Sequence, residues 1–380
     1  MFPRLAERGP WTRVKPVLNL TNLAKTILLG FLLCPGFALR GADTAGQIER
    51  LPRTNLLVYH DRKGELAPVR SKTGWQKRRS EVIQGMQEIM GPLPGREKRC
   101  PLEMKIESDV DSGSYIRRFI TYSSEPGSRV PAYLLVPKQA LSGRVRLPAI
   151  LALHPTDMEY GHRVVIESLR GYYSIYGHDL VERGFVVLAP AYPLMANYQP
   201  DLKALGYRSG TMKAIWDNMC GLDLLDSLPY VRPHRYGAIG HSLGGHNAIY
   251  TAVFDPRIRV VVSSCGFDSF LDYMNGHIKG WTSDRYMPKL LEYKDRLADI
   301  PFDFHELIAA LAPRPVFINA PLGDTNFKWS SVDEIVKAAA PVYRLYRASE
   351  NLRVEHPDCG HDFPPEIREM AYRFLDQFLR

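Results

Sequence analysis

Five short apolar runs, separated by segments of helical pattern, constrain the fold of this chain more than any other feature. They span residues 148–154, 184–190, 236–240, 259–264 and 315–321. Each run is apolar throughout instead of alternating with polar residues, which is typical of strands buried on both faces of a parallel sheet. The helical patterns between the runs predict repeated βα units and therefore an open, doubly wound α/β sheet.

The expected helices lie at 177–182, 211–228, 243–254, 303–311 and 332–346, and a last strand at 352–355 precedes a final helix at 365–379. Three β-rich segments come before this series, at 102–110, 115–124 and 132–137. The turns that separate them predict antiparallel strands at the N-terminal side of the sheet. A further helix is expected over 75–90, because Gly91-Pro92 follows and ends it.

Three parts of the chain differ in character. The sequence predicts a signal peptide over residues 1–42, an irregular N-terminal segment over 43–72, and a single α/β domain over 73–380. Within that domain, residues 266–300 form a long excursion that is rich in aromatic and charged side chains. Excursions of this length are commonly functional, so we expect a lid or a pocket wall.

The signal-peptide prediction rests on an apolar stretch of fourteen residues, Thr26 to Leu39, that follows a basic segment. This stretch is too short for a comfortable membrane span and has the layout of a secretory leader. We expect an exported protein, periplasmic or extracellular, with no stable membrane insertion after the leader is removed. Lipidation at Cys34 and an uncleaved anchor are the alternatives.

The composition excludes several classes of protein. The net charge of +8 is concentrated in the leader, which carries six basic residues and one acidic residue up to position 42. The rest is nearly balanced, so no nucleic-acid partner is expected. Cys100, Cys220, Cys265 and Cys359 follow the leader and allow three pairings, although free thiols are slightly favoured. The chain has no typical zinc-binding motif, and neither a metal nor a cofactor is expected.

A G-x-S-x-G motif, Gly240-His241-Ser242-Leu243-Gly244, stands between an apolar run and a helical segment. A strand that turns abruptly into a helix leaves the serine in a strained backbone conformation, with its hydroxyl above the sheet. The glycines leave room where a Cβ would collide with neighbouring backbone. Ser242 is therefore the candidate nucleophile, and the N–H of Leu243 at the helix start is a candidate oxyanion donor.

A serine nucleophile needs a base, and the base needs a carboxylate that orients it. His361 lies in the loop between the last strand and the last helix, which makes it the candidate base. Two acids compete for the third role, Asp324 after the run at 315–321 and Asp268 after the run at 259–264. Asp324 is favoured because its strand immediately precedes the strand that leads to the histidine.

These motifs resemble the α/β-hydrolase superfamily: GHSLGG between a strand and a helix, then LGDTNF and CGHDFP, in that order. More narrowly, the chain is similar to secreted bacterial esterases grouped with dienelactone hydrolases and acetyl xylan esterases. This similarity extends from about Trp75 to the C-terminus. The resemblance implies an α/β-hydrolase fold with a Ser-His-Asp triad, in which residues 266–300 are an insertion after the sixth strand.

The chain departs from that family at the second oxyanion donor. Family members commonly carry His-Gly-x after the corresponding strand, whereas this chain has His154-Pro155-Thr156. Because proline has no N–H, the resemblance implies that the N–H of Thr156 is the donor. We expect His154 to be structural rather than a second base.

The expected function is a serine carboxylic-ester hydrolase that forms an acyl-enzyme on small-molecule or oligosaccharide esters, such as carbohydrate acetyl esters. Aromatic residues favour a sugar substrate, and Trp281, Tyr192 and Trp329 are the expected binding residues. One alternative is a peptidase of the prolyl-oligopeptidase type, although the segment before residue 148 is too short for its usual propeller. The other is a non-catalytic binding protein that keeps the fold.

Overall fold

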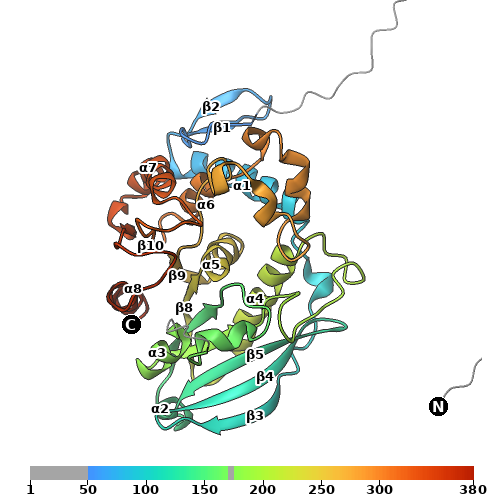
Figure 1. Ribbon diagram of the computed structural model, residues 1–380, viewed down its shortest axis with the longest axis vertical. Helices are drawn as coiled ribbons and strands as arrows, with labels where there is room; N and C mark the ends of the chain where they lie inside the picture. The colour runs from blue at the N-terminus through green and yellow to red at the C-terminus, as the bar shows by residue number, and fades with distance from the viewer. Residues whose placement is uncertain (1–49, 170–174) are drawn as a thin grey trace, which may run out of the picture. The chain divides into compact units, whose positions relative to one another are not determined.

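The computed structural model describes residues 50–169 and 175–380 (Figure 1). The predicted signal peptide over residues 1–42 lies outside these ranges, as do the first residues of the segment 43–72. In the described part of the chain, no helix combines the length and the apolar character that crossing a membrane requires. The four cysteines that follow the leader are free thiols in the structure.

The core of the fold is a nine-stranded sheet with the order β11-β10-β9-β8-β6-β7-β5-β4-β3. Strands β3 to β5, and the pair β5 and β7, run antiparallel, whereas the other neighbours run parallel. The prediction of a mostly parallel, doubly wound sheet with antiparallel N-terminal strands is therefore confirmed. The strands are β3 (Lys105–Asp111), β4 (Tyr115–Glu125), β5 (Ser128–Pro137), β6 (Leu147–Leu153), β7 (Val186–Pro190), β8 (Val231–His241), β9 (Ile258–Ser264), β10 (Val316–Asn319) and β11 (Leu352–Glu355).

Helices cover both faces of the parallel part of the sheet (Figure 1). On one face lie α3 and α8, and on the other lie α4 and α5, with α1, α6 and α7 beyond them. This explains why the strands are apolar throughout: Val260 and Val262 pack towards α8, while Val261 between them packs towards α5. The helices are α1 (Lys72–Met90), α2 (Lys138–Leu141), α3 (Tyr176–Glu182), α4 (Gly210–Ser227), α5 (Leu243–Phe254), α6 (Phe304–Leu311), α7 (Trp329–Tyr346) and α8 (Pro365–Leu379).

The segment 43–72 is more regular than the sequence indicated. It contains a small antiparallel pair, β1 (Val58–His60) and β2 (Leu66–Pro68), joined by a turn in which Gly64 has a φ of +81°. Each strand has only three residues, which is too short for an alternating pattern to stand out. Arg50 and Arg53 bind this segment to α6 through ion pairs of 2.8 and 2.9 Å with Glu306 and Asp303.

Residues 266–300, the predicted excursion, leave the sheet after β9 and contain no α-helix or β-strand. Short 3₁₀ helices build them, and their aromatic side chains pack against α5 and α6. These 3₁₀ helices are η3 (Tyr273–Asn275), η4 (Ile278–Trp281), η5 (Pro288–Tyr293) and η6 (Leu297–Asp299).

Candidate active site

Ser242 stands at the sharp turn between β8 and α5. Its backbone has φ 55° and ψ −121°, a conformation that a residue with a side chain adopts only under strain. The turn is held from the neighbouring strand, because the N–H of Ser242 donates to the carbonyl of Ser264 at 2.8 Å. This is the strand–turn–helix geometry that presents a serine hydroxyl above the sheet.

Two glycines of the motif are required by close packing. A Cβ on Gly240 would lie 2.1 Å from the carbonyl carbon of Gly244, and a Cβ on Gly244 would lie 1.9 Å from the carbonyl oxygen of Leu153. Both distances are far below contact between non-bonded atoms, and the obstructing atoms are backbone. The start of α5 can approach the end of β6 this closely only because residue 244 is glycine, and it can fold back against the end of β8 only because residue 240 is glycine.

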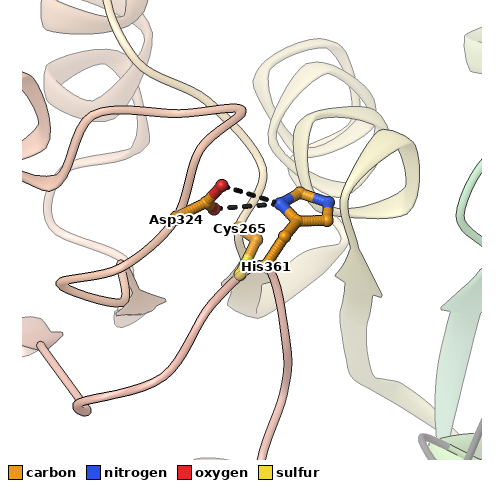
Figure 2. Close-up of side chains that lie close together, drawn as sticks. All are labelled: Cys265, Asp324 and His361. Atoms are coloured by element: carbon orange, nitrogen blue, oxygen red, sulfur yellow. Dashed lines mark hydrogen bonds and ion pairs between the residues drawn. The ribbon is translucent and has the colours of Figure 1, made fainter.

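His361 and Asp324 form a hydrogen-bonded pair (Figure 2). The Nδ1 atom of His361 lies 3.0 and 2.9 Å from the two carboxylate oxygens of Asp324. Since an ionised carboxylate only accepts, Nδ1 carries a proton. In the neutral ring, the lone pair is then on the second nitrogen, which points away from Asp324 in Figure 2. That is the tautomer a general base requires.

The environment of Asp324 favours its charged form. The side chain is 1% exposed, and burial alone would raise its pKa. The hydrogen bond from His361 and the backbone N–H groups of Asn326 and Phe327 outweigh burial, so the pKa of Asp324 lies below its usual value. A permanently ionised carboxylate can stabilise a positive charge on the neighbouring imidazole.

Asp268, the competing acid, has different surroundings. It is 1% exposed, and one carboxylate oxygen accepts from the N–H of Lys328 at 3.1 Å. The other oxygen has no partner among the described residues. Burial raises the pKa of Asp268 to about 8. The hydrogen bond from the Lys328 N–H lowers this pKa, whereas the charges of Asp272 and Asp303 raise it further. The hydrogen-bonded partner of His361 is therefore Asp324.

A small pocket with a cavity volume of about 60 Å³ borders Ser242. The ring of His361 lies 5.9 Å from the ring of Phe327, which is part of the pocket wall. It also lies 4.9 Å from the ring of His241. The imidazole is thus near both a pocket residue and the residue that precedes Ser242. The pocket is lined by Thr156, Ser242, Leu243, His246, Tyr273, Gly280, Trp281, Tyr286, Asn326 and Phe327.

Leu243 and Thr156, the predicted oxyanion donors, both border this pocket beside Ser242. The N–H of Leu243 is the first of α5, and such groups have no acceptor within their helix. The hydroxyl of Thr156 lies 2.8 Å from the hydroxyl of Tyr286, which connects the loop after β6 to the excursion.

Of the three predicted substrate-binding aromatics, Trp281 lines the pocket. Tyr192 is 3% exposed and lies outside the lining, where its hydroxyl donates to the carbonyl of Arg285 at 2.8 Å. Trp329 is 38% exposed, also lies outside the lining, and packs edge-on against His356. The structure therefore brings one of the three rings to the nucleophile.

His154 holds the loop that follows β6. Its Nε2 atom accepts from the N–H of Tyr192 at 3.0 Å, and its Nδ1 atom lies 2.7 Å from the carbonyl of Pro155. Burial lowers the pKa of His154 to about 4. The ring is neutral near pH 7 and both nitrogens are occupied, which fits the structural role expected from the sequence.

Cys265 lies beside the His361–Asp324 pair (Figure 2), and the donor atoms of the three side chains lie within 4.8 Å of one another. Sulfur, oxygen and nitrogen ligands at this spacing could hold a metal ion. However, burial raises the pKa of Cys265 well above its usual value, and the thiolate is the form that binds metals. Nδ1 of His361 is also engaged by Asp324, so the cluster fits an acid–imidazole pair better.

His246 is a pocket residue that the motif analysis missed. It lies four residues after Ser242, in the first turn of α5. This spacing could have identified it from the sequence. Asn326, also in the lining, could have been found from its place two residues after Asp324.

Comparisons with known proteins agree with this fold. The model of the prolyl oligopeptidase family matches residues 174–329. YtaP of Bacillus subtilis, whose name describes a hydrolase, is 27% identical over 317 residues, which cover 79% of this chain and all of YtaP.

Two solved structures are similar at lower identity. The glucuronoyl esterase from Solibacter usitatus superimposes with a TM-score of 0.68 at 19% identity, covering 85% of this chain and 97% of that protein. Acetyl xylan esterase 1 from Thermoanaerobacterium superimposes with a TM-score of 0.53 at 17% identity, covering 78% and 99%. The chain has the α/β-hydrolase fold, and its predicted resemblance to that superfamily is confirmed.

Proposed function

We propose that this protein is a serine carboxylic-ester hydrolase that uses Ser242, His361 and Asp324. The observation that carries this proposal is a strained serine turn at the pocket, combined with a hydrogen-bonded His–Asp pair whose imidazole lies 5.9 Å, ring to ring, from the pocket residue Phe327. The family match and the names of the similar proteins support hydrolase chemistry.

In the proposed reaction, the hydroxyl oxygen of Ser242 attacks the ester carbonyl and its proton passes to Nε2 of His361. His361 then protonates the leaving alcohol as the tetrahedral intermediate collapses to an acyl-enzyme. Water then gives up a proton to the same nitrogen and attacks the acyl carbon. As the bond from that carbon to the Ser242 oxygen breaks and the acid leaves, His361 returns the proton to the serine oxygen. Asp324 stays ionised and stabilises the imidazolium in both half-reactions.

The developing oxyanion is held by backbone N–H groups. We assign these to Leu243 at the start of α5 and to Thr156 after β6, since both border the pocket. A helix start favours negative charge, which adds to the hydrogen bond from Leu243. Tyr286 fixes Thr156 through its hydroxyl, so the excursion helps to hold the donor loop in place.

The proposed substrate is a carbohydrate ester. The pocket wall is rich in aromatic rings, Tyr273, Trp281, Tyr286 and Phe327, which suit the apolar faces of sugar rings. Glucuronoyl and acetyl xylan esterases among the similar structures support the same class. A peptidase is the second candidate, because the matching family model is that of prolyl oligopeptidases; hydrolysis of aminoacyl anilides in preference to esters would favour it.

Replacing the nucleophile tests the proposal. Ser242→Ala should lower kcat on a nitrophenyl ester by roughly 10⁴-fold, because only binding and the oxyanion hole remain. The matched control is Ser263→Ala, which removes a buried hydroxyl that has no hydrogen-bond partner among the described residues. A Ser242→Ala enzyme within tenfold of wild type would refute the assignment, as would the absence of covalent labelling of wild-type protein by a fluorophosphonate.

We also propose that the protein is exported, on the basis of the apolar stretch from Thr26 to Leu39. Expressed in a host with an export system, it should leave the cytoplasm with its N-terminus near residues 39–43. Intact-mass measurement checks this. A soluble cytoplasmic protein that retains residues 1–38 would contradict it.

A further inference from the structure

Two buried polar atoms of pocket residues have no hydrogen-bond partner among the described residues. They are Nε2 of His246 and Nε1 of Trp281, and both residues line the pocket beside Ser242. The residues are 5% and 3% exposed. Buried polar groups are nearly always hydrogen-bonded, so two unpaired atoms at one pocket require an explanation.

The unpaired atom of His246 is a hydrogen-bond acceptor. The Nδ1 atom lies 2.9 Å from the carbonyl oxygen of Gly266, and a carbonyl can only accept. Nδ1 therefore carries the proton, which leaves a lone pair on Nε2. Burial lowers the pKa of His246 to about 3, so the ring remains neutral near pH 7.

The unpaired atom of Trp281 is a donor, because an indole nitrogen always carries its proton. The ring centroids of His246 and Trp281 are 4.6 Å apart. Phe270 and Tyr273 pack edge-on against the indole at 5.5 and 5.6 Å, which fixes its orientation. A donor and an acceptor, each without a partner among the described residues, therefore lie on two neighbouring rings that line the pocket.

A hydroxyl group complements this pair, because it donates one hydrogen bond and accepts others. We propose that His246 and Trp281 form a subsite for one hydroxyl group of the substrate, which donates to Nε2 of His246 and accepts from Nε1 of Trp281. This inference rests on the proposed esterase function and narrows its substrate class to esters of hydroxylated rings.

The position of His246 limits where that hydroxyl lies. Ser242, His246 and Trp281 line one small pocket, which has a cavity volume of about 60 Å³. The recognised hydroxyl is therefore on the ring that carries the scissile ester, not on a distant unit of a polymer.

The test compares substrates that differ by one hydroxyl. Two probes are used, a monoacetylated methyl xyloside and the methyl ester of a methyl glucuronoside, each with its series of monodeoxy analogues. For the probe that wild-type enzyme hydrolyses faster, deleting the recognised hydroxyl should lower kcat/KM by roughly 10- to 100-fold, because the buried pair is then left unsatisfied.

Two variants should abolish this discrimination. His246→Phe keeps a ring against Trp281 but removes both nitrogens. Trp281→Phe keeps an aromatic ring but removes the N–H donor. In each, the same deletion should change kcat/KM by less than about threefold. The readout is the ratio of the kcat/KM values of one enzyme on the full and the deoxy substrate, so a general loss of activity cancels. If His246→Phe does not fold, Trp281→Phe still tests the proposal.

Tyr250→Phe is the matched control. The hydroxyl of Tyr250 is also buried and has no partner in residues 50–169 and 175–380. Its ring lies 5.5 Å from the ring of His246, but Tyr250 is outside the pocket lining. This variant should discriminate as wild type does. Three outcomes would overturn the subsite but not the proposed function. Both pocket variants could discriminate as wild type does, or wild-type enzyme could be indifferent to every hydroxyl. Wild-type enzyme could also hydrolyse nitrophenyl acetate but neither sugar probe. Failure to hydrolyse any ester would overturn the proposed function and the subsite with it.

Discussion

Two aspartates follow neighbouring parallel strands, yet their chemistry differs. Asp324 follows β10 and Asp268 follows β9, and both side chains are buried. Asp324 is bonded to His361 and has a lowered pKa, whereas the pKa of Asp268 is raised to about 8 by burial. An acid can thus follow the end of either parallel strand, and the groups that bind its carboxyl group determine whether it is charged.

Both carboxyl groups also accept hydrogen bonds from the same loop, residues 326–328. Asp324 accepts from the N–H groups of Asn326 and Phe327, and Asp268 accepts from the next N–H, that of Lys328. One carboxylate therefore orients the imidazole, and the other holds the segment that leads from Asp324 into α7. We infer that Asp268 is a positioning residue rather than the orienting acid.

The largest expected effect separates the two acids by activity. Asp324→Asn should lower kcat by roughly 10³- to 10⁴-fold, because the amide stabilises neither the required tautomer nor the imidazolium. Asp268→Asn keeps an oxygen acceptor for Lys328 and should stay within about tenfold of wild type. Steady-state kinetics on a nitrophenyl ester measures both, and a reversed order would make Asp268 the orienting acid.

A smaller effect distinguishes the aspartates by the pH dependence of stability. Asp268 has a raised pKa, so its contribution to stability is full below about pH 4, the unfolded value, and is lost as the pH rises through about 8. Asp324 has a lowered pKa, so its contribution is present above the unfolded value and is lost as the pH falls through the folded value.

The corresponding measurement is the melting temperature of both Asn variants between pH 4 and pH 9. Relative to wild type, Asp268→Asn should gain stability steadily as the pH rises, by a few degrees at the upper end. Asp324→Asn should instead be less stable than wild type at neutral pH and approach it in acid. Parallel curves for the two variants would show that the two carboxylates do not differ in charge.

The smallest expected effect concerns the loop. Asp268→Ala removes the acceptor of the Lys328 N–H, whereas Asp268→Asn retains one. We expect kcat of the alanine variant to be lower than that of the asparagine variant by about threefold, the scale of one hydrogen bond. Faster amide exchange at Lys328 in the alanine variant alone should accompany this loss. Equal exchange in both would show that Asp268 does not hold the loop.

Much of this fold could be predicted because its signals are local. The helix at 243–254 and the strand at 352–355 have the predicted bounds, since each follows from a short run of residues with clear boundaries. The serine turn could be predicted as well, because the glycine spacing that allows it lies within five residues. Asp324 was favoured by strand order alone, which is topological information that the sequence carries.

Other features depend on contacts between distant segments and could not be predicted. The proton-free nitrogen of His246 follows from the carbonyl of Gly266, 20 residues away in the chain. Tyr192 looked like a pocket residue, but its hydroxyl is bonded to Arg285, which lies 93 residues further on. Neither hydrogen-bond partner is visible in local pattern or composition.

The contact between Gly244 and Leu153 also bears on how such enzymes diversify. Because the strand end and the helix start meet with no room for a methyl group, the turn at Ser242 tolerates no side chain at position 244. New substrate ranges must then arise above it, in the excursion at 266–300 that supplies Trp281 and Tyr286. Engineering by exchange of that excursion between relatives should alter selectivity more readily than mutations near the serine, while the chemical machinery is inherited unchanged.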